Sequence, residues 1–363
     1  MANCVYIHIP FCVKKCNYCA FCSFSLLKKK DDYINALLDE IEFFYKNEPL
    51  KTIYFGGGTP SLLDIVDFRK ILSKLNYNSK TQITLEMNPT SVTKEKLLGI
   101  KNLKIDRLSL GVQSFDDEIL KIIGRTHKKE DIFNSIDLIK KMGFKNLSID
   151  LMYGLPSQTL KNWEETLETA LKLNIEHISL YGLKIEEGTY FYHNPPKNLA
   201  NDELQARMYE LAIEKLKNDF IHYEFSNFAK NESYFSKHNL AYWNRYEYYG
   251  FGLSASGFID KKRYTNTFNF SEYLKNPKKE KDFEILSPQN EIEEEIFLGL
   301  RLISGINLEK INEKYNIDTY KMFKKEFDEH IKNGFLKKEK NIISLTQKGI
   351  LVSNEILCDF IKV

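Results

Sequence analysis

The stretch Cys4–Cys22, CVYIHIPFCVKKCNYCAFC, decides how the rest of the chain is read. Its first residues are mostly β-branched and apolar, so they predict a buried strand. Directly after that strand, Cys12, Cys16 and Cys19 form the spacing C-x3-C-x2-C. The chain has 6 cysteines, and all but one fall in this stretch. A disulfide framework would spread them through the chain, so the clustering indicates a metal site.

Three thiolates on one short loop predict an iron–sulfur cluster. Cys12, Cys16 and Cys19 can bind three irons of a [4Fe–4S] cubane and leave the fourth iron for a non-protein ligand, and soft thiolates suit such clusters. In radical S-adenosylmethionine (SAM) chemistry that ligand is SAM. A zinc-binding module without radical chemistry is the alternative, with Cys22 or His8 as fourth ligand.

Strand-like and helix-like segments alternate over the first 220 or so residues. Strands are expected at 4–10, 52–57, 82–88, 106–112, 146–154 and 177–183, and helices at 31–46, 64–75, 93–103, 116–124, 131–143, 160–174 and 202–219. Such alternation predicts a parallel sheet with right-handed crossovers. Six βα units are fewer than the eight of a closed barrel, so the expected fold is α/β, an open partial (βα)6 barrel.

The pattern changes after the sixth unit. We expect residues 1–229 to form the partial barrel, 230–285 to be an aromatic-rich connection without clear periodicity, and 286–363 to form a helical, winged-helix-like domain. The last segment combines a helical pattern near residues 291–302 with a strand-like stretch at 335–345. The sequence therefore predicts a barrel followed by a small C-terminal domain.

Polar and glycine-rich segments lie toward the C-terminal ends of the predicted strands of the barrel. They are Pro10–Cys12, Gly56–Thr59, Glu86–Pro89, Gln113, Asp150 and Tyr181. The carboxyl ends of parallel strands share one edge of the sheet, where ligands of such folds bind. We therefore expect one active site at the mouth of the barrel.

Charge and hydropathy exclude several classes of function. With 52 Lys+Arg against 50 Asp+Glu, the net charge of +2 gives no reason to expect a nucleic-acid partner. No run approaches the ~20 apolar residues of a membrane span, and residues 1–4 show no secretory signal. The expected location is the cytoplasm, and any membrane contact is expected to be peripheral.

Longer motifs add a family resemblance. The chain resembles the oxygen-independent coproporphyrinogen III oxidase family of radical SAM proteins over nearly its whole length, most weakly after residue 307. The matching motifs are YIHIPFC (6–12), GGGTPS (56–61), EMNP (86–89), RLSLGVQS (107–114), GRTH (124–127), IDLMYGLP (149–156), HISLY (177–181), YEFSNFA (223–229), HNLAYW (238–243) and GFG (250–252). Their order along the chain makes the resemblance far more specific than any one motif.

The resemblance implies which residues bind the cofactors. It implies that Cys12, Cys16 and Cys19 bind the cluster. It also implies that SAM is bound by Tyr6, Tyr18, Gly57, Gly58, Thr59, Glu86, Gln113, Arg125 and Asp150. The glycines would let the backbone approach the SAM amino group closely. The two carboxylates would accept hydrogen bonds from ribose hydroxyls, and the guanidinium would grip a carboxylate.

Two members of the family compete. One is the oxidase itself, which uses a 5′-deoxyadenosyl radical in porphyrin biosynthesis to convert two propionates of coproporphyrinogen III to vinyls. The other is a heme chaperone, which binds heme and passes it to apoproteins such as respiratory enzymes. The resemblance assigns no catalytic residue under either of these two functions. It also implies that the protein can form a homodimer.

Three features favour the chaperone. Phe21 stands where the oxidase has a further cysteine, which is displaced here to Cys22. Only 11 residues precede Cys12, whereas the oxidase has a longer N-terminal arm. The motif H-N-x-x-Y-W starting at His238 matches the chaperones and implies this imidazole as an axial heme ligand. Nearby aromatic rings that could pack on a porphyrin are Tyr242, Trp243, Tyr246, Tyr248 and Tyr249.

Overall fold

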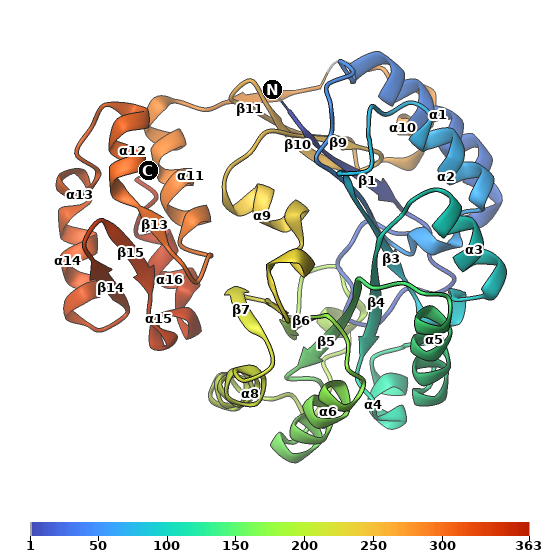
Figure 1. Ribbon diagram of the computed structural model, residues 1–363, viewed down its shortest axis with the longest axis horizontal. Coiled ribbons are helices and arrows are strands. Elements are labelled where there is room, and N and C mark those ends of the chain that lie inside the picture. The colour runs from blue at the N-terminus through green and yellow to red at the C-terminus, as the bar shows by residue number, and fades with distance from the viewer. Residues whose placement is uncertain (1, 280, 363) are drawn as a thin grey trace.

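A twelve-stranded sheet dominates the computed structural model, which describes residues 2–279 and 281–362 (Figure 1). The order of its strands is β12-β11-β10-β9-β1-β2-β3-β4-β5-β6-β8-β7. The first six strands of the chain, β1 (Cys4–Ile9), β2 (Thr52–Gly57), β3 (Gln82–Met87), β4 (Arg107–Gln113), β5 (Leu147–Tyr153) and β6 (His177–Gly182), are neighbours in sequence order and all pair in parallel. The predicted α/β fold with an open, partial (βα)6 barrel is therefore confirmed.

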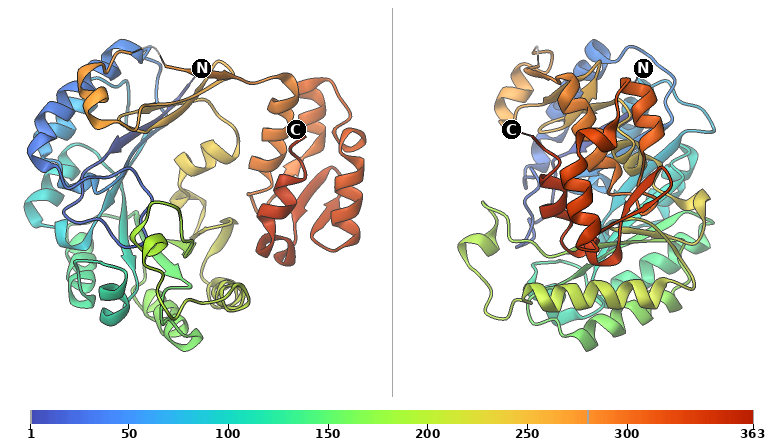
Figure 2. Two further views of the ribbon diagram at one scale, coloured as in Figure 1. Left: turned by 180° about the vertical axis from the view of Figure 1, so that it is seen from behind. Right: turned by 90° about the vertical axis from the view of Figure 1, so that its left-hand side faces the viewer.

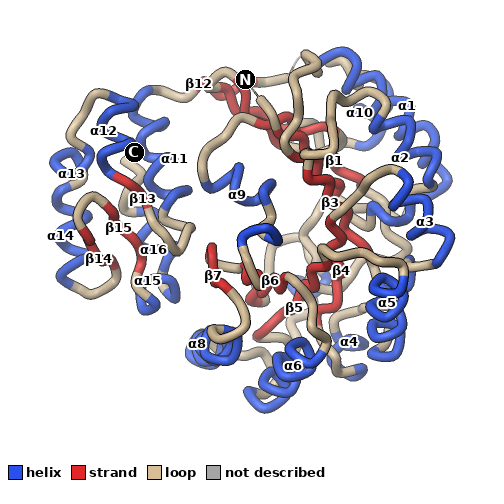
Figure 3. The backbone as a smooth tube through the Cα atoms, viewed as in Figure 1, coloured by secondary structure: helices blue, strands red, loops and turns tan. Residues whose placement is uncertain are grey.

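Helices cover the outer face of the curved sheet, as the two views in Figure 2 and the colouring in Figure 3 show. They are α1 (Lys30–Phe44), α2 (Ile65–Leu72), α3 (Lys94–Asn102), α4 (Asp117–Ile122), α5 (Lys129–Lys141), α6 (Leu160–Lys172) and α8 (Asp202–Leu216). Thr93 begins α3 as predicted, since its side chain accepts a hydrogen bond from the Lys96 N–H at 3.2 Å. Within the described part of the chain, no helix has the length and apolar character needed to cross a bilayer.

The segment after the barrel contains strands that the sequence analysis did not predict. The short strands β9 (Tyr248–Phe251), β10 (Ser256–Ile259), β11 (Lys262–Thr265) and β12 (Phe283–Ile285) extend the sheet beyond β1. The first of them pairs in parallel with β1. Strands of three or four residues are too short for a two-residue period to stand out. At the other edge, β8 (Asn227–Ala229) and β7 (Ile221–Glu224) continue antiparallel from β6.

A buried carboxylate ties this extension to the barrel. Glu40 on α1 accepts hydrogen bonds from the Gly252 N–H at 2.8 Å, the Asn266 side chain at 2.7 Å and the Tyr273 hydroxyl at 2.7 Å. It also forms an ion pair with Lys281 at 2.9 Å, and both side chains are almost fully enclosed. A buried charge of this kind is stable only because its partners surround it.

The C-terminal segment has a core of its own, centred on residues such as Ile296, Phe323, Phe327 and Phe360. It contains α11 (Pro288–Gly299), α12 (Leu308–Tyr315), α13 (Thr319–Met322), α14 (Lys324–Lys332), α15 (Gln347–Leu351), α16 (Ser353–Cys358) and a small sheet of β13 (Ile306–Asn307), β15 (Ile342–Leu345) and β14 (Leu336–Glu339). We propose that 286–363 is a separate domain. It lies beside the open side of the barrel (Figure 1).

Replacing Glu40 by alanine should destabilise the protein by about 3–5 kcal/mol, because Lys281 would keep its charge without a buried partner. Urea unfolding of the wild type and the variant measures this difference. The double variant Glu40→Ala/Lys281→Met is the control and should recover part of the loss. A cost below about 1 kcal/mol for Glu40→Ala would show that the buried pair does not hold the extension.

Candidate functional site

The cysteine loop lies at the carboxyl end of β1 and is fastened at several points. The Phe24 N–H donates to the Pro10 carbonyl at 2.7 Å, and the Cys12 N–H donates back to the Phe24 carbonyl at 3.0 Å. Farther along the loop, the Asn17 N–H donates to the Ile123 carbonyl, beyond α4, at 3.0 Å. The loop is therefore held against both β1 and the segment that follows α4.

The three predicted cluster ligands lie on this loop with polar groups around them. Cys12 is buried, and Cys16 and Cys19 are partly buried. The Thr59 hydroxyl lies 3.7 Å from the Cys12 Sγ, and an Arg125 Nη1 lies 3.6 Å from the Cys16 Sγ. These contacts place a hydroxyl and a guanidinium beside two of the three sulfur atoms.

The donor set consists of three thiols on one loop, with Arg125 nearby. Thiolates are the usual ligands of iron–sulfur clusters, and in a cubane each of the three would bind a different iron. The residues present therefore fit the [4Fe–4S] cluster that the sequence predicts.

Gly58 allows the β2 end to pack on the cysteine loop. A Cβ atom at this position would lie 2.6 Å from the Phe11 carbonyl oxygen and 3.0 Å from the Cys12 Sγ. Two backbone hydrogen bonds hold the same contact, from the Gly58 N–H to the Ile9 carbonyl at 2.8 Å and from the Thr59 N–H to the Phe11 carbonyl at 2.7 Å. Only glycine permits so close an approach, which accounts for this part of the glycine run.

The other predicted SAM residues lie around the mouth and interior of the barrel. The Tyr54 hydroxyl donates to Glu86 at 2.7 Å, and the Ser109 hydroxyl donates to Asp150 at 3.1 Å. Arg125 donates to the Gly111 carbonyl at 2.6 Å and also contacts Tyr18. The ring of Tyr6, on β1, contacts the rings of both Tyr54 and His238. Gln113 has a positive φ of 67° at the end of β4. The structure thus brings the predicted set together on the inner side of one sheet.

Burial changes the acidity of the two barrel carboxyls. Desolvation raises the pKa of Glu86 to about 7, with the charge of Asp150 adding to the effect. Desolvation also raises the pKa of Asp150. Both groups therefore hold a proton more readily than in water, as groups placed to exchange hydrogen bonds with a polar ligand often do.

His238 lies in an unexpected place. It is on α9 (Lys237–Trp243), a short helix in the open side of the barrel (Figure 1), and only 1% of its surface is exposed. Its Nδ1 is 2.7 Å from the Thr52 Oγ1, and its Nε2 is 2.8 Å from the Tyr242 Oη. Burial lowers the pKa of His238 to about 3, so the ring is neutral. Both ring nitrogens already have hydrogen-bond partners.

Neighbouring residues of α9 point in different directions. Tyr242 follows His238 by one turn and shares its side of the helix, toward the barrel. Trp243 instead stacks with Arg301 of the C-terminal segment, 4.5 Å from ring centre to guanidinium carbon. The helix therefore connects the barrel interior to the C-terminal segment.

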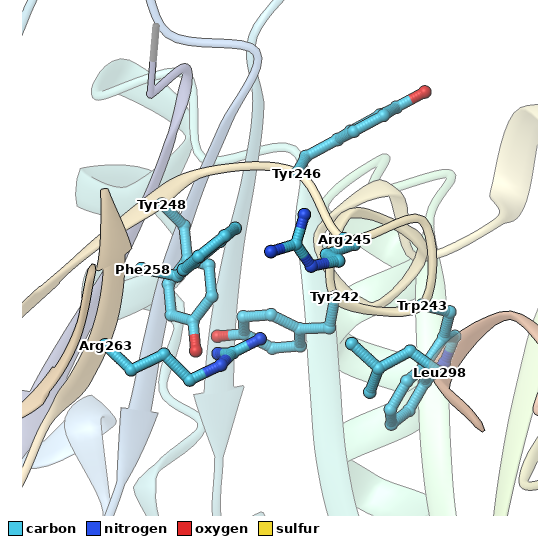
Figure 4. A pocket seen from close by; sticks show the side chains of 8 residues that line it. All are labelled: Tyr242, Trp243, Arg245, Tyr246, Tyr248, Phe258, Arg263 and Leu298. Atoms are coloured by element: carbon cyan, nitrogen blue, oxygen red, sulfur yellow. The ribbon is translucent and has the colours of Figure 1, made fainter. Parts of the chain in front are cut away.

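Two cavities flank α9. The first, which we call the α9 cavity, has a volume of about 230 Å³ and is lined by Tyr242, Trp243, Arg245, Tyr246, Tyr248, Phe258, Arg263 and Leu298 (Figure 4). The second, the loop cavity, has a volume of about 330 Å³ and is lined by Tyr6, His8, Ala20, Phe21, Cys22, Tyr242, Tyr248, Ser254, Ser256 and Phe268. Tyr242 and Tyr248 belong to both and separate them.

The aromatic residues singled out from the sequence lie partly at these cavities. Tyr242, Trp243, Tyr246 and Tyr248 line one or both of them, whereas Tyr249 lines neither and donates to Glu48 at 3.0 Å. In the α9 cavity, Arg245 and Arg263 are both paired with Glu294 and both stack on Phe258. These arginines, Phe258 and Phe268 were missed in the sequence analysis because no motif contains them.

In the variant Glu86→Gln, the free energy of unfolding should fall less than in the wild type as the pH rises from 5 to 8. The folded protein holds the Glu86 proton more tightly than the unfolded chain, whose glutamate pKa is near 4.5, so this contribution is full below pH 4.5 and is lost as the pH rises through about 7. Urea unfolding should show that the fall in the free energy of unfolding over this pH range is smaller in the variant by roughly 1–3 kcal/mol. The control is Glu95→Gln, an exposed residue of α3; equal profiles for both variants would contradict the assignment.

Comparisons with known proteins agree with this arrangement. Residues 6–170 match the radical SAM superfamily, and residues 286–352 match the HemN C-terminal domain. The chain is 38% identical to a protein named heme chaperone HemW from Bacillus subtilis (strain 168), covering 98% of each chain. It is 37% identical to the protein of the same name from Lactococcus lactis subsp. lactis (strain IL1403), covering 99% of this chain and 97% of that one.

Among solved structures, the fold resembles that of coproporphyrinogen III oxidase (HemN) from Escherichia coli. The TM-score is 0.85, with 21% sequence identity over 99% of this chain and 90% of the other. At that identity the similarity establishes the fold alone. It covers both the barrel and the C-terminal segment.

Proposed function

We propose, from the premise that this chain belongs to the radical SAM family of proteins named heme chaperone HemW, that it binds heme and passes it to heme-accepting apoproteins. The observation that carries the proposal is the position of α9. Its motif residue Tyr242 lines a cavity that Ala20, Phe21 and Cys22 of the cysteine loop also line, and His238 contacts Tyr242 from behind. Respiratory enzymes as recipients, a cytoplasmic location and a homodimer belong to the same proposal.

A [4Fe–4S] cluster and SAM are part of the proposed function, as membership of the radical SAM superfamily implies. When bound, the cluster supplies an electron to SAM. The thiolates of Cys12, Cys16 and Cys19 would hold the cluster, and Arg125 would compensate their negative charge.

For SAM, the chain offers groups of different kinds at the barrel mouth. The close backbone approach at Gly57, Gly58 and Thr59 leaves main-chain groups beside the cluster loop for the amino acid part. Glu86 and Asp150 would accept hydrogen bonds from hydroxyl groups deeper in the barrel. The remaining proposed SAM contacts are Tyr6, Tyr18, Gln113 and Arg125.

Oxygen-independent coproporphyrinogen III oxidase is the second candidate function, and the similarity in fold to HemN is what favours it. The same cluster and SAM residues would serve either function. The difference is whether the tetrapyrrole is a substrate or a cargo. Phe21 occupies the loop position of the oxidase cysteine, lines the loop cavity and is 65% exposed, which favours an apolar surface for a bound cargo there.

An anaerobic heme titration followed by absorbance tests the choice. The reconstituted wild type should take up heme stoichiometrically and show no coproporphyrinogen turnover. His238→Ala should bind heme at least about tenfold more weakly, about 1.4 kcal/mol, because it removes the imidazole at the centre of the α9 contacts.

The matched control is His193→Ala, an exposed histidine of α7 (Tyr190–His193), which should bind like the wild type. Conversion of coproporphyrinogen to protoporphyrinogen without specific heme binding would make this protein the oxidase. Equal heme affinities in His238→Ala and His193→Ala would show that α9 is not part of the heme site.

Cys16→Ser should lower the iron content and the cluster absorbance after anaerobic reconstitution, because one of the three iron ligands is lost. Elemental analysis of the wild type should find iron and not zinc. The control Cys358→Ser changes an exposed thiol of α16 and should leave both readings unchanged. A full cluster spectrum in Cys16→Ser would show that this cysteine is not a ligand.

A further inference from the structure

Of the two barrel-facing residues of α9, Tyr242 is the one that reaches a cavity. Its ring lines the loop cavity and is partly exposed. His238 lies behind it, 1% exposed, with its ring stacked on Tyr54 at 5.1 Å between centroids. A ligand in the loop cavity would therefore meet the phenol before the imidazole.

A chain of hydrogen bonds fixes the imidazole in that second position. The Thr52 Oγ1 is 2.7 Å from Nδ1, and the Tyr242 Oη is 2.8 Å from Nε2 of His238. For His238 to bind iron through Nε2, the Tyr242 hydroxyl would have to move away from that nitrogen. For binding through Nδ1, the buried Thr52 hydroxyl would lose its partner, which is costly.

The loop cavity suits a flat apolar ligand. Two of its lining residues, Phe21 and Phe268, are 65% and 66% exposed, which is unusual for rings of this size on one surface. Flat macrocycles bind well between such rings. His8, the histidine that lines this cavity, has both nitrogens engaged, Nδ1 with the Tyr6 hydroxyl at 3.1 Å and Nε2 with the Cys22 carbonyl at 2.8 Å.

We propose that Tyr242 binds the iron of ferric heme in the loop cavity and that His238 is the positioning residue behind it. This inference rests on the proposed heme function and names the ligand for it. Phenolate oxygen is one of the side-chain ligands that proteins use for heme iron. The hydrogen bond to His238 aims the phenol.

The binding step balances without an oxidant or a reductant. The O–H bond of Tyr242 would break, its oxygen would form a bond to ferric iron, and the proton would be released to solvent. The imidazole, which burial keeps neutral, would then hold its hydrogen on Nε2 and donate it to the bound phenolate oxygen, while the Thr52 hydroxyl donates to Nδ1.

Tyr6 is the rival ligand. Its hydroxyl also pairs with a histidine and lines the same cavity, although at 3.1 Å from His8 the contact is longer than that of Tyr242 with His238. Tyr6 lies on β1 close to the cysteine loop, where the proposed SAM site needs it. The two tyrosines can be told apart by removing one hydroxyl at a time.

The test is a titration of ferric heme into the reconstituted full-length protein, read by absorbance, electron paramagnetic resonance and resonance Raman spectroscopy. The wild type should show high-spin ferric heme with an iron–tyrosinate vibration. Tyr242→Phe should lose that vibration and bind at least about tenfold more weakly. Tyr242→His should replace the tyrosinate signature with that of an imidazole ligand.

Controls separate ligation from general damage. Tyr192→Phe, at an exposed tyrosine of α7 that lines neither cavity, should keep the wild-type spectrum, and its cluster absorbance should equal that of Tyr242→Phe. His238→Ala should bind more weakly while keeping the tyrosinate vibration, since it removes the positioning group and not the ligand.

Three results would overturn the inference while leaving heme binding in place. They are an unchanged spectrum in Tyr242→Phe, loss of the tyrosinate signature in Tyr6→Phe instead, and a wild-type imidazole or thiolate spectrum that disappears in His238→Ala or Cys22→Ser. Absence of heme uptake by the wild type would overturn the proposed function together with this inference.

Discussion

The contact between the cysteine loop and the end of β2 is the constraint on which the site depends. Backbone hydrogen bonds from Gly58 and Thr59 fasten it, and Gly58 has no room for a Cβ atom. Because β1 and β2 are parallel neighbours, this contact places the three loop cysteines on the same side of the sheet as the barrel carboxylates. The sheet order thus determines which side chains share the mouth of the barrel.

Much of the fold could be predicted from hydrophobic periodicity and capping residues. The six parallel strands are long and apolar, and caps such as Thr93 and Thr159 mark helix starts locally. The four strands from 248 to 285 could not be predicted, because each is short and is stabilised by contacts with distant partners. Glu40 is one such partner, more than 200 residues away in sequence from Gly252 and Asn266.

The site was predictable where residues follow strands and unpredictable where distant segments meet. Glu86 and Gln113 lie near the ends of β3 and β4 and follow from the rule that strand ends collect at one edge, whereas Asp150 lies in the middle of β5. The surroundings of His238 do not, because Thr52 is 186 residues away and no local pattern relates the two. A motif indicates residue types and spacing, while the direction of a side chain is decided by the neighbours it finds after folding.

The position of Trp243 has a mechanical consequence. This residue is next to Tyr242 in sequence, yet its ring stacks on Arg301 in the C-terminal segment while Tyr242 forms a wall of both cavities. A seven-residue helix is too short to bend independently at its two sides. A displacement of the C-terminal segment would therefore be transmitted through Trp243 to Tyr242, so the wall shared by the two cavities would respond to the position of that segment.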